Sequence, residues 1–176
     1  MYRLSEEIEL EIEWKGLEIH PEFPREGVPS EVYLSQNQRT LLWRNVKDLA
    51  QEGGLEMKMP DRLSKSDLSL LGGQFSKEKE RLKEYSRAIY RAYFSRGQDI
   101  GSLHILREAL REAGMDSEEF SSCLGKGQLK ESLEAYQREA QDWVVSAVPT
   151  FMIAGKRLVG AQSIQVLKEA VLFGNQ

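Results

Sequence analysis

The sequence predicts an α/β fold in which a small sheet is interrupted by a large all-helical insertion. Near the N-terminus, apolar and acidic residues alternate over residues 8–14. Helical spacing of apolar residues then continues from about residue 30 to residue 145. After residue 146 the period returns to that of strands, and one more helix follows. The predicted order is therefore strand, helical block, strand, strand and helix.

The first predicted strand covers residues 8–14. Its apolar residues alternate with glutamates: Ile8, Leu10, Ile12 and Trp14 against Glu9, Glu11 and Glu13. A period of two is typical of a strand with one buried face and one face in water. The next stretch, HPEFPREGVPS, contains three prolines and a glycine, and these residues predict a loop.

Six helices are expected in the helical block, because apolar residues recur every three or four positions. Gly72-Gly73 should interrupt the second of them, and Gly53-Gly54 should end the first. The expected bounds are about 30–52, a weaker segment within 55–76, about 77–96, Ser102 to about Ala113, a short helix from Asp116 or Ser117, and about 128–145.

The C-terminal part returns to strands. The segments TFMIA and RLVG, joined by a turn at Gly155-Lys156, predict a β-hairpin, and Ser163 is placed to begin the last helix. A sheet of only three strands beside so large a helical block is lopsided, since a small sheet with an exposed edge is marginally stable by itself.

Composition and charge exclude several classes of protein. The chain has 176 residues with 24 basic and 28 acidic side chains, a net charge of −4, so it presents no basic face for nucleic acid. No apolar run approaches the roughly 20 residues of a membrane span, and the first residues do not resemble an export signal. A cytoplasmic location is therefore expected. The single cysteine, Cys123, excludes an internal disulfide, a CxxC pair and a thiolate zinc site built from this chain alone.

Few residues are candidates for chemistry. His20 could act as an acid or base, although a hydrogen-bonding role in its loop is favoured over catalysis. Cys123 is better interpreted as a small buried apolar residue of a helix, and His104 as a solvated side chain. The two histidines lie far apart without a carboxylate pattern, so we predict no metal site. No residue is predicted to be catalytic.

The stretch SAVPTFMIAG places Pro149 directly before an apolar run. Proline lacks the N–H that an interior strand position uses, so it should lie at the start of the strand or in a turn. Two interpretations follow from the residues alone: an ordinary trans start of a strand, or a cis turn that presents backbone atoms to a ligand.

Four segments, in this order and spacing, resemble the DsbA-like thioredoxin-fold family, especially its cytoplasmic FrnE-type branch. They are EIEWKGLEIHPEFPREGVP, AIYRAYFSRGQDIG, LREALREAGMD and SAVPTFMIAGKRLVGAQSIQVLKEAV. The most specific part is VPTFMIAGKRLVGAQ, in which Val148-Pro149 matches the cis-proline turn of the family.

The resemblance implies a thioredoxin-like sheet that is incomplete, with its first strand absent, and a large helical insertion. Residues 1–29 and 146–176 would form the thioredoxin-like domain, and residues 30–145 the insertion. It also implies that the backbone at a cis Val148-Pro149 turn can bind an extended peptide or glutathione. The implied binding residues are Val148, Pro149, Thr150 and His20, and glutathione is the one cofactor considered.

The expected function is that of a FrnE-type thiol-disulfide oxidoreductase family member whose redox CxxC motif is absent from this sequence. Dithiol activity is therefore not expected. The alternatives are a glutathione-dependent protein resembling 2-hydroxychromene-2-carboxylate isomerase and a non-catalytic peptide- or thiol-binding protein. Because the strand at 8–14 would lack a neighbour, a homodimer formed by strand pairing or strand exchange is a further expectation.

Overall fold

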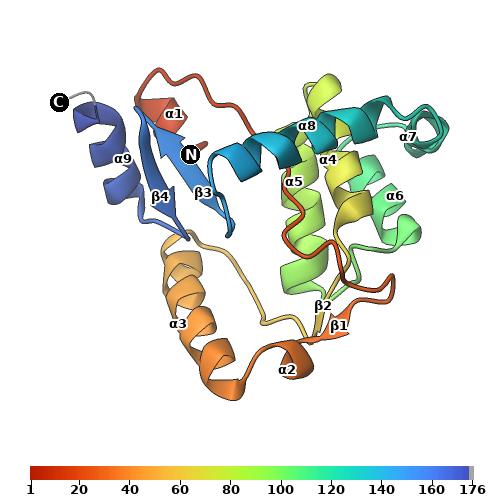
Figure 1. Cartoon of the computed structure of the whole chain (residues 1–176), viewed down its shortest axis with the longest axis horizontal. Coiled ribbons are helices and arrows are strands. Elements are labelled where there is room, and N and C mark those ends of the chain that lie inside the picture. The colour runs from red at the N-terminus through yellow and green to blue at the C-terminus, as the bar shows by residue number, and fades with distance from the viewer. Residues whose placement is uncertain (175–176) are drawn as a thin grey trace.

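The computed structural model describes residues 1–174, and at positions 45 and 128 the backbone only. Helices form most of the described chain: α1 (Leu4–Glu7), α2 (Ser30–Tyr33), α3 (Gln36–Glu52), α4 (Asp67–Glu78), α5 (Leu82–Tyr90), the π-helix η1 (Arg91–Ser95), α6 (Leu103–Glu112), α7 (Ser117–Leu124), α8 (Gln128–Asp142) and α9 (Ile164–Phe173). The strands are short: β1 (Val28–Pro29), β2 (Arg62–Leu63), β3 (Thr150–Ile153) and β4 (Lys156–Val159). In Figure 1, helices α4 to α8 gather on one side of the molecule, and β3, β4 and α9 lie on the other.

The main hydrophobic core lies in the helical bundle. Its buried residues come from α4 to α8 and the turn before α7: Phe75, Tyr85, Ala88, Ile89, Leu106, Ala109, Leu110, Ala113, Met115, Phe120 and Leu129. Phe75 and Phe120 meet edge to face, with ring centroids 5.4 Å apart. Cys123 is half-buried and packs against this core, which agrees with its interpretation as an apolar residue. Apolar burial in the bundle is therefore the principal source of its stability.

The predicted hairpin and last helix are confirmed. Strands β3 and β4 pair antiparallel from Thr150↔Val159 to Ile153↔Lys156, so the tight turn is Ala154-Gly155, one residue earlier than expected. Gly155 has a φ of +76°, a conformation that glycine adopts without steric cost. At the start of α9, the Ser163 side chain accepts a hydrogen bond from the Val166 N–H.

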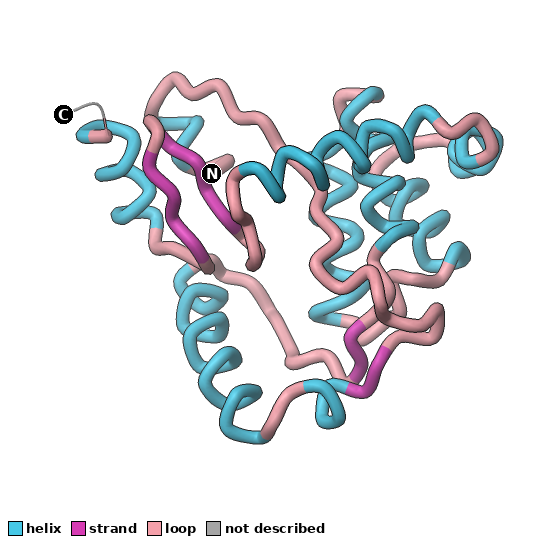
Figure 2. The backbone as a smooth tube through the Cα atoms, viewed as in Figure 1, coloured by secondary structure: helices cyan, strands magenta, loops and turns pink. Residues whose placement is uncertain are grey.

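The predicted strand at residues 8–14 is wrong. No strand in the described part of the chain pairs with this segment, which runs as a loop over the top of the molecule in Figure 2. The alternation is nevertheless visible: Ile8, Leu10 and Ile12 are half-buried and the glutamates between them are exposed. Alternation decides which side chains face inward, but a strand also needs a neighbour that satisfies its N–H and C=O groups. The predicted three-stranded sheet is therefore a two-stranded hairpin.

Two predicted helices divide differently. The helix expected over 77–96 is interrupted at residues 79–81, where Glu80 has a φ of 56°. Gly72-Gly73, expected to interrupt a helix, lies inside α4. Tertiary packing explains the glycine at position 72, because a Cβ there would lie 2.5 Å from the Tyr85 hydroxyl and 2.7 Å from Leu106 Cδ1.

The first predicted helix is also two elements. Helix α2 ends at Tyr33, and Ser35 caps α3 through a capping box. The Ser35 hydroxyl accepts from the Gln38 N–H, and the Gln38 side chain accepts from the Ser35 N–H. Before α2, Val28–Pro29 pairs with Arg62–Leu63. This two-residue ladder was not predicted, because so short a segment has no periodicity.

Burial of Tyr85 makes the stability of the folded state depend on pH. Its side chain is buried and its hydroxyl donates to the Ser69 carbonyl at 2.7 Å, and burial raises the pKa of Tyr85 well above the ordinary value near 10. The folded state thus keeps a proton that the unfolded chain releases. We expect the free energy of unfolding to fall as pH rises above about 10, with at most about 1.4 kcal/mol per pH unit from this group.

Urea unfolding at pH 9, 10, 10.5 and 11 measures this slope. Tyr85→Phe should be less stable at pH 9, because the Ser69 carbonyl loses its donor, and should lose stability less steeply above pH 10. Equal slopes for the two proteins would contradict the assignment to Tyr85.

Candidate functional site

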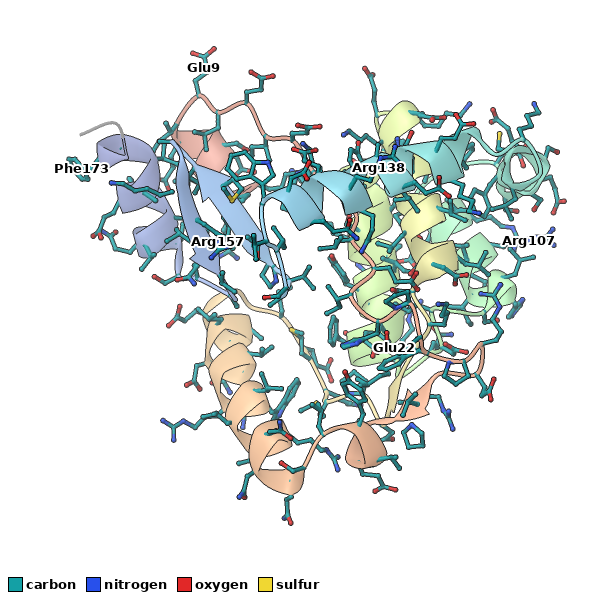
Figure 3. All side chains as sticks on the ribbon, viewed as in Figure 1. Glu9, Glu22, Arg107, Arg138, Arg157 and Phe173 are labelled. Atoms are coloured by element: carbon teal, nitrogen blue, oxygen red, sulfur yellow. The ribbon has the colours of Figure 1, made fainter. Side chains whose placement is uncertain are left out.

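The segment that enters the hairpin is held at both ends. After α8 the chain turns at Trp143 and Val144, whose carbonyls both accept from Arg157 Nη1 at 3.0 Å. Figure 3 shows Arg157 on β4, on the side facing the end of α8. This side chain therefore ties the second strand of the hairpin to the helix that precedes the first strand.

The turn itself is fixed by two further hydrogen bonds. The Thr150 hydroxyl donates to the Ala147 carbonyl at 2.6 Å, and the Gly160 N–H donates to the Pro149 carbonyl at 2.8 Å. The peptide bond between Val148 and Pro149 is cis. Gly160 has a φ of +86°, which favours glycine at the position that extends the ladder beyond Val159.

Val148 lies exposed between these fixed points. The residue is 49% exposed and Pro149 is exposed as well. Among the residues that the structure describes, neither the N–H nor the C=O of Val148 has a hydrogen-bond partner. Unpaired backbone groups on a held segment can hydrogen-bond an extended peptide in the manner of an added strand.

His20 belongs to a different cluster. It stacks on Phe23 with ring centroids 4.6 Å apart, and its Nδ1 lies 3.1 Å from Glu22 Oε1 and 3.1 Å from the Tyr33 hydroxyl. Lys65 fixes the chain on both sides of His20, because it donates to the Pro21 carbonyl and forms an ion pair with Glu18. Within residues 1–174, no hydrogen bond or ring contact joins His20 to residues 148–150. Of the four predicted binding residues, the structure brings together the three that are contiguous in sequence.

The partners of His20 were not predicted. Glu22 is two residues away, and the spacing H-x-E was the available signal; Tyr33 comes from α2 and could not be anticipated. The pKa of the Glu22 carboxyl lies below its ordinary value, because the carboxylate accepts a hydrogen bond from its own backbone N–H and a weaker contribution from His20 acts in the same direction. The cluster is thus an imidazole oriented by a carboxylate and a phenol.

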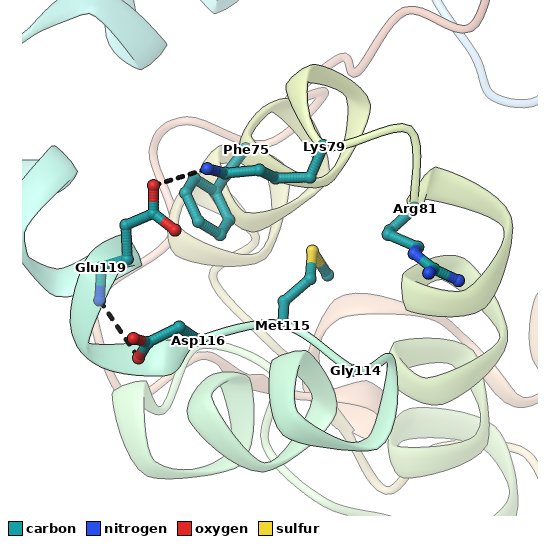
Figure 4. A pocket seen from close by; sticks show the side chains of 7 residues that line it. All are labelled: Phe75, Lys79, Arg81, Gly114, Met115, Asp116 and Glu119. Atoms are coloured by element: carbon teal, nitrogen blue, oxygen red, sulfur yellow. Dashed lines mark hydrogen bonds and ion pairs between the residues drawn. The ribbon is translucent and has the colours of Figure 1, made fainter.

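A hollow of about 240 Å³ lies on the bundle between α4 and α7. Figure 4 shows Lys79 paired with Glu119, and Asp116 accepting from the Glu119 N–H as the N-cap of α7, while Arg81 has no contact drawn. The hydrogen bond that Lys79 donates to the Glu119 carboxylate raises the pKa of Lys79. The contacts of Lys79, Asp116 and Glu119 serve the packing of the helices, and the one remaining charged group of the lining, Arg81, does not make a ligand site by itself.

The described residues form neither a cluster of metal ligands nor a membrane-spanning helix. Within the described residues, no group of three or more histidine, cysteine, aspartate or glutamate side chains lies close enough together to hold a metal ion. None of the helices in residues 1–174 combines the length and apolar character that crossing a bilayer requires.

The fold and the turn at Val148–Thr150, which we call the hairpin-entry turn, define the class of protein. The model of the DSBA-like thioredoxin domain matches residues 2–172, and the chain belongs to this family. The uncharacterized protein YwbO of Bacillus subtilis (strain 168) is 26% identical over 170 residues, which cover 93% of this chain and 82% of YwbO.

Two solved structures share the fold. A probable DsbA oxidoreductase from Streptomyces coelicolor superimposes with a TM-score of 0.77 at 24% identity, covering 92% of this chain and 75% of that one. A protein from Nitrosomonas europaea, named as a candidate protein disulfide isomerase, gives a TM-score of 0.63 at 17% identity, covering 80% and 74%. The chain therefore has the DsbA-like thioredoxin fold, as the sequence predicted.

Proposed function

We propose that this chain is a FrnE-type member of the DsbA-like family that binds extended polypeptide at the Val148–Thr150 turn. We further propose that its 176 residues do not catalyse dithiol exchange by themselves. The observation that carries the proposal is Val148, exposed and with both backbone polar groups unpaired within the described chain, between the Thr150–Ala147 and Gly160–Pro149 hydrogen bonds.

The thiol content of the sequence supports the proposal that this chain does not catalyse dithiol exchange by itself. Exchange of a disulfide needs a nucleophilic thiolate and a second thiol that resolves the mixed disulfide. The sequence contains only Cys123, which is half-buried against the bundle core beside Leu124. A half-buried cysteine in apolar surroundings is a poor nucleophile. The two structural neighbours are named as a probable DsbA oxidoreductase and a candidate protein disulfide isomerase. Because a protein disulfide isomerase acts on polypeptides, these names support a polypeptide ligand for this chain.

Two substitutions at one position test the backbone contact. Val148→Pro removes the N–H, whereas Val148→Ala keeps it and removes only an exposed side chain. With reduced, carboxamidomethylated insulin B chain as the probe, we expect Val148→Pro to bind about three- to tenfold more weakly, the effect of one hydrogen bond, and Val148→Ala to bind within about twofold of the parent. Isothermal titration measures the affinities, and circular dichroism shows whether both variants are folded.

Unchanged affinity in a folded Val148→Pro variant would contradict the backbone contact. Reduction of insulin by this polypeptide in dithiothreitol, above the rate of a Cys123→Ser control, would contradict the absence of dithiol exchange. Glutathione serves as a second probe: if it binds at the turn and the B chain does not, the isomerase-like alternative is favoured.

A further inference from the structure

A groove runs along α3, away from the Val148 turn. Gln36, Arg39, Thr40, Trp43, Arg44 and Lys47 follow one another at helical spacing and therefore form a single stripe on the helix. Leu34, at the end of α2, and Met59, from the segment after α3, complete the walls, and the groove encloses about 720 Å³. We call it the α3 groove. In Figure 1, α3 stands at the edge of the molecule, apart from the helical bundle.

The α3 groove concentrates unpaired positive charge. Arg39, Arg44 and Lys47 line it, and within the described residues none of their side chains has an ion pair or a hydrogen bond. The one acidic residue on the lining is Glu31. Other exposed cations, such as Arg91 and Lys79, are paired with glutamates, and those unpaired in the described chain, such as Lys126 and Arg138, do not share a groove with two further cations. The groove therefore has a local charge that an anionic partner would complement.

The lining also has apolar character. Leu34, Trp43 and Met59 are each half-buried, so part of each side chain remains accessible inside the groove. Tryptophan and arginine are the residue types that contribute most to protein interfaces. A ligand that fits this lining carries both carboxylates and an apolar side chain.

The dimensions and charge favour a peptide over nucleic acid. From Arg39 to Lys47 the helix rises by about 12 Å, the length of about four residues of extended peptide. Three cations on a chain with a net charge of −4 are too few for phosphate-backbone binding, which commonly uses six to ten contacts. We propose that the α3 groove binds a short extended acidic segment of a partner protein, with its carboxylates on the three cations and an apolar side chain on Trp43.

Peptides matched in shape test the charge complementarity. The probe is the fluorescein-labelled peptide DEFEELD, and the control is NQFQQLN, which keeps the apolar residues without the charges. Fluorescence polarisation should show binding of the probe that weakens at least about tenfold between 0.05 and 0.5 M NaCl, because salt screens exposed charges. Equal binding of the control peptide would overturn the proposal.

Substitutions locate the binding site. The triple variant Arg39→Gln, Arg44→Gln, Lys47→Gln should bind the probe at least about tenfold more weakly, and Trp43→Ala should also weaken binding while keeping the salt dependence. The matched control is Lys126→Gln with Arg138→Gln, two exposed cations of the bundle side without ion pairs in the described chain; Figure 3 shows Arg138 on α8. Circular dichroism checks that each variant is folded.

Three results would overturn the proposal. The first is an equal loss of affinity in the Lys126 and Arg138 control, which would mean non-specific charge attraction. The second is displacement of the probe by an equimolar dT10 oligonucleotide, which would indicate nucleic acid as the ligand. The third is loss of probe binding in Val148→Pro, which would place the probe at the hairpin-entry turn. This last variant also separates the two proposals, since either can fail while the other stands.

Discussion

Replacing Phe120 by alanine is expected to lower the free energy of unfolding by about 3–5 kcal/mol, the largest effect of any single change considered for this protein. The side chain is fully buried. It packs on the ring of Phe75 with centroids 5.4 Å apart, at the point where α7 meets α4. The substitution removes the buried ring and its edge-to-face contact, and it leaves a cavity that rigid helices fill only in part.

Urea unfolding followed by circular dichroism at 222 nm measures the change. Phe173→Ala is the matched control, because Phe173 is 56% exposed at the end of α9 and points out of the molecule in Figure 3. The control should cost less than about 1 kcal/mol. A loss of similar size in both variants would show that the bundle core is not centred on Phe120.

Gly72→Ala is expected to destabilise the protein by about 1–3 kcal/mol, although alanine is the better helix former. A Cβ at this position would lie 2.5 Å from the Tyr85 hydroxyl and 2.7 Å from Leu106 Cδ1. Tyr85 cannot easily withdraw, since its hydroxyl donates to the Ser69 carbonyl and its ring is buried. The helices α4, α5 and α6 would have to move apart to admit one methyl group.

Gly73→Ala provides a control of opposite sign in the same helix. The nearest atom to a Cβ at Gly73 is Tyr85 Cε1 at 3.8 Å, an ordinary contact. This variant should gain about 0.5–1 kcal/mol, because alanine loses less backbone entropy than glycine when the helix forms. Thermal unfolding of the two variants gives the comparison. Stabilisation by Gly72→Ala would mean that the three helices are not packed as closely as the structure has them.

The buried core that stabilises the protein and the turn proposed to bind polypeptide lie in different parts of the molecule. In the described part of the chain, the bundle contains most of the buried apolar side chains, whereas the hairpin and α9 contribute only Leu167. The exposed Val148 turn thus lies on a small two-stranded unit beside a well-packed helical body. The division into residues 1–29 with 146–176 and residues 30–145 stays a prediction, and so does the homodimer, which light scattering can test.

Local signals predicted much of the fold correctly. The helices α6, α7 and α8 begin within a residue or so of the expected positions, and the hairpin and α9 follow the predicted order. The capping box at Ser35 was equally local, and applying the S-x-x-Q pattern would have divided α2 from α3. Val148 to Thr150, predicted as binding residues, lie together at the entry to the hairpin because they are contiguous in sequence; their role stays a prediction.

The errors arose where distant residues decide the outcome. Position 72 is a glycine inside a helix because Tyr85 and Leu106 occupy the space that a side chain there would need. His20 acquired Tyr33 as a partner through the path of a loop, and Arg157 holds the hairpin entry from another strand. None of these pairs has a sequence spacing that a periodic pattern could reveal.

The sequence by itself determined the helical spacing, the capping serines, the hairpin and the alternation of residues 8–14, because each depends on neighbours a few positions away. Only the tertiary structure decided that residues 8–14 form no strand, and that Val148 is left exposed and unpaired within the described chain. It also decided that three cations line one groove without an ion pair to any described residue. The physical reason is that hydrogen-bond partners, burial and charge neutralisation are supplied by other segments of the chain, whose positions no local pattern specifies.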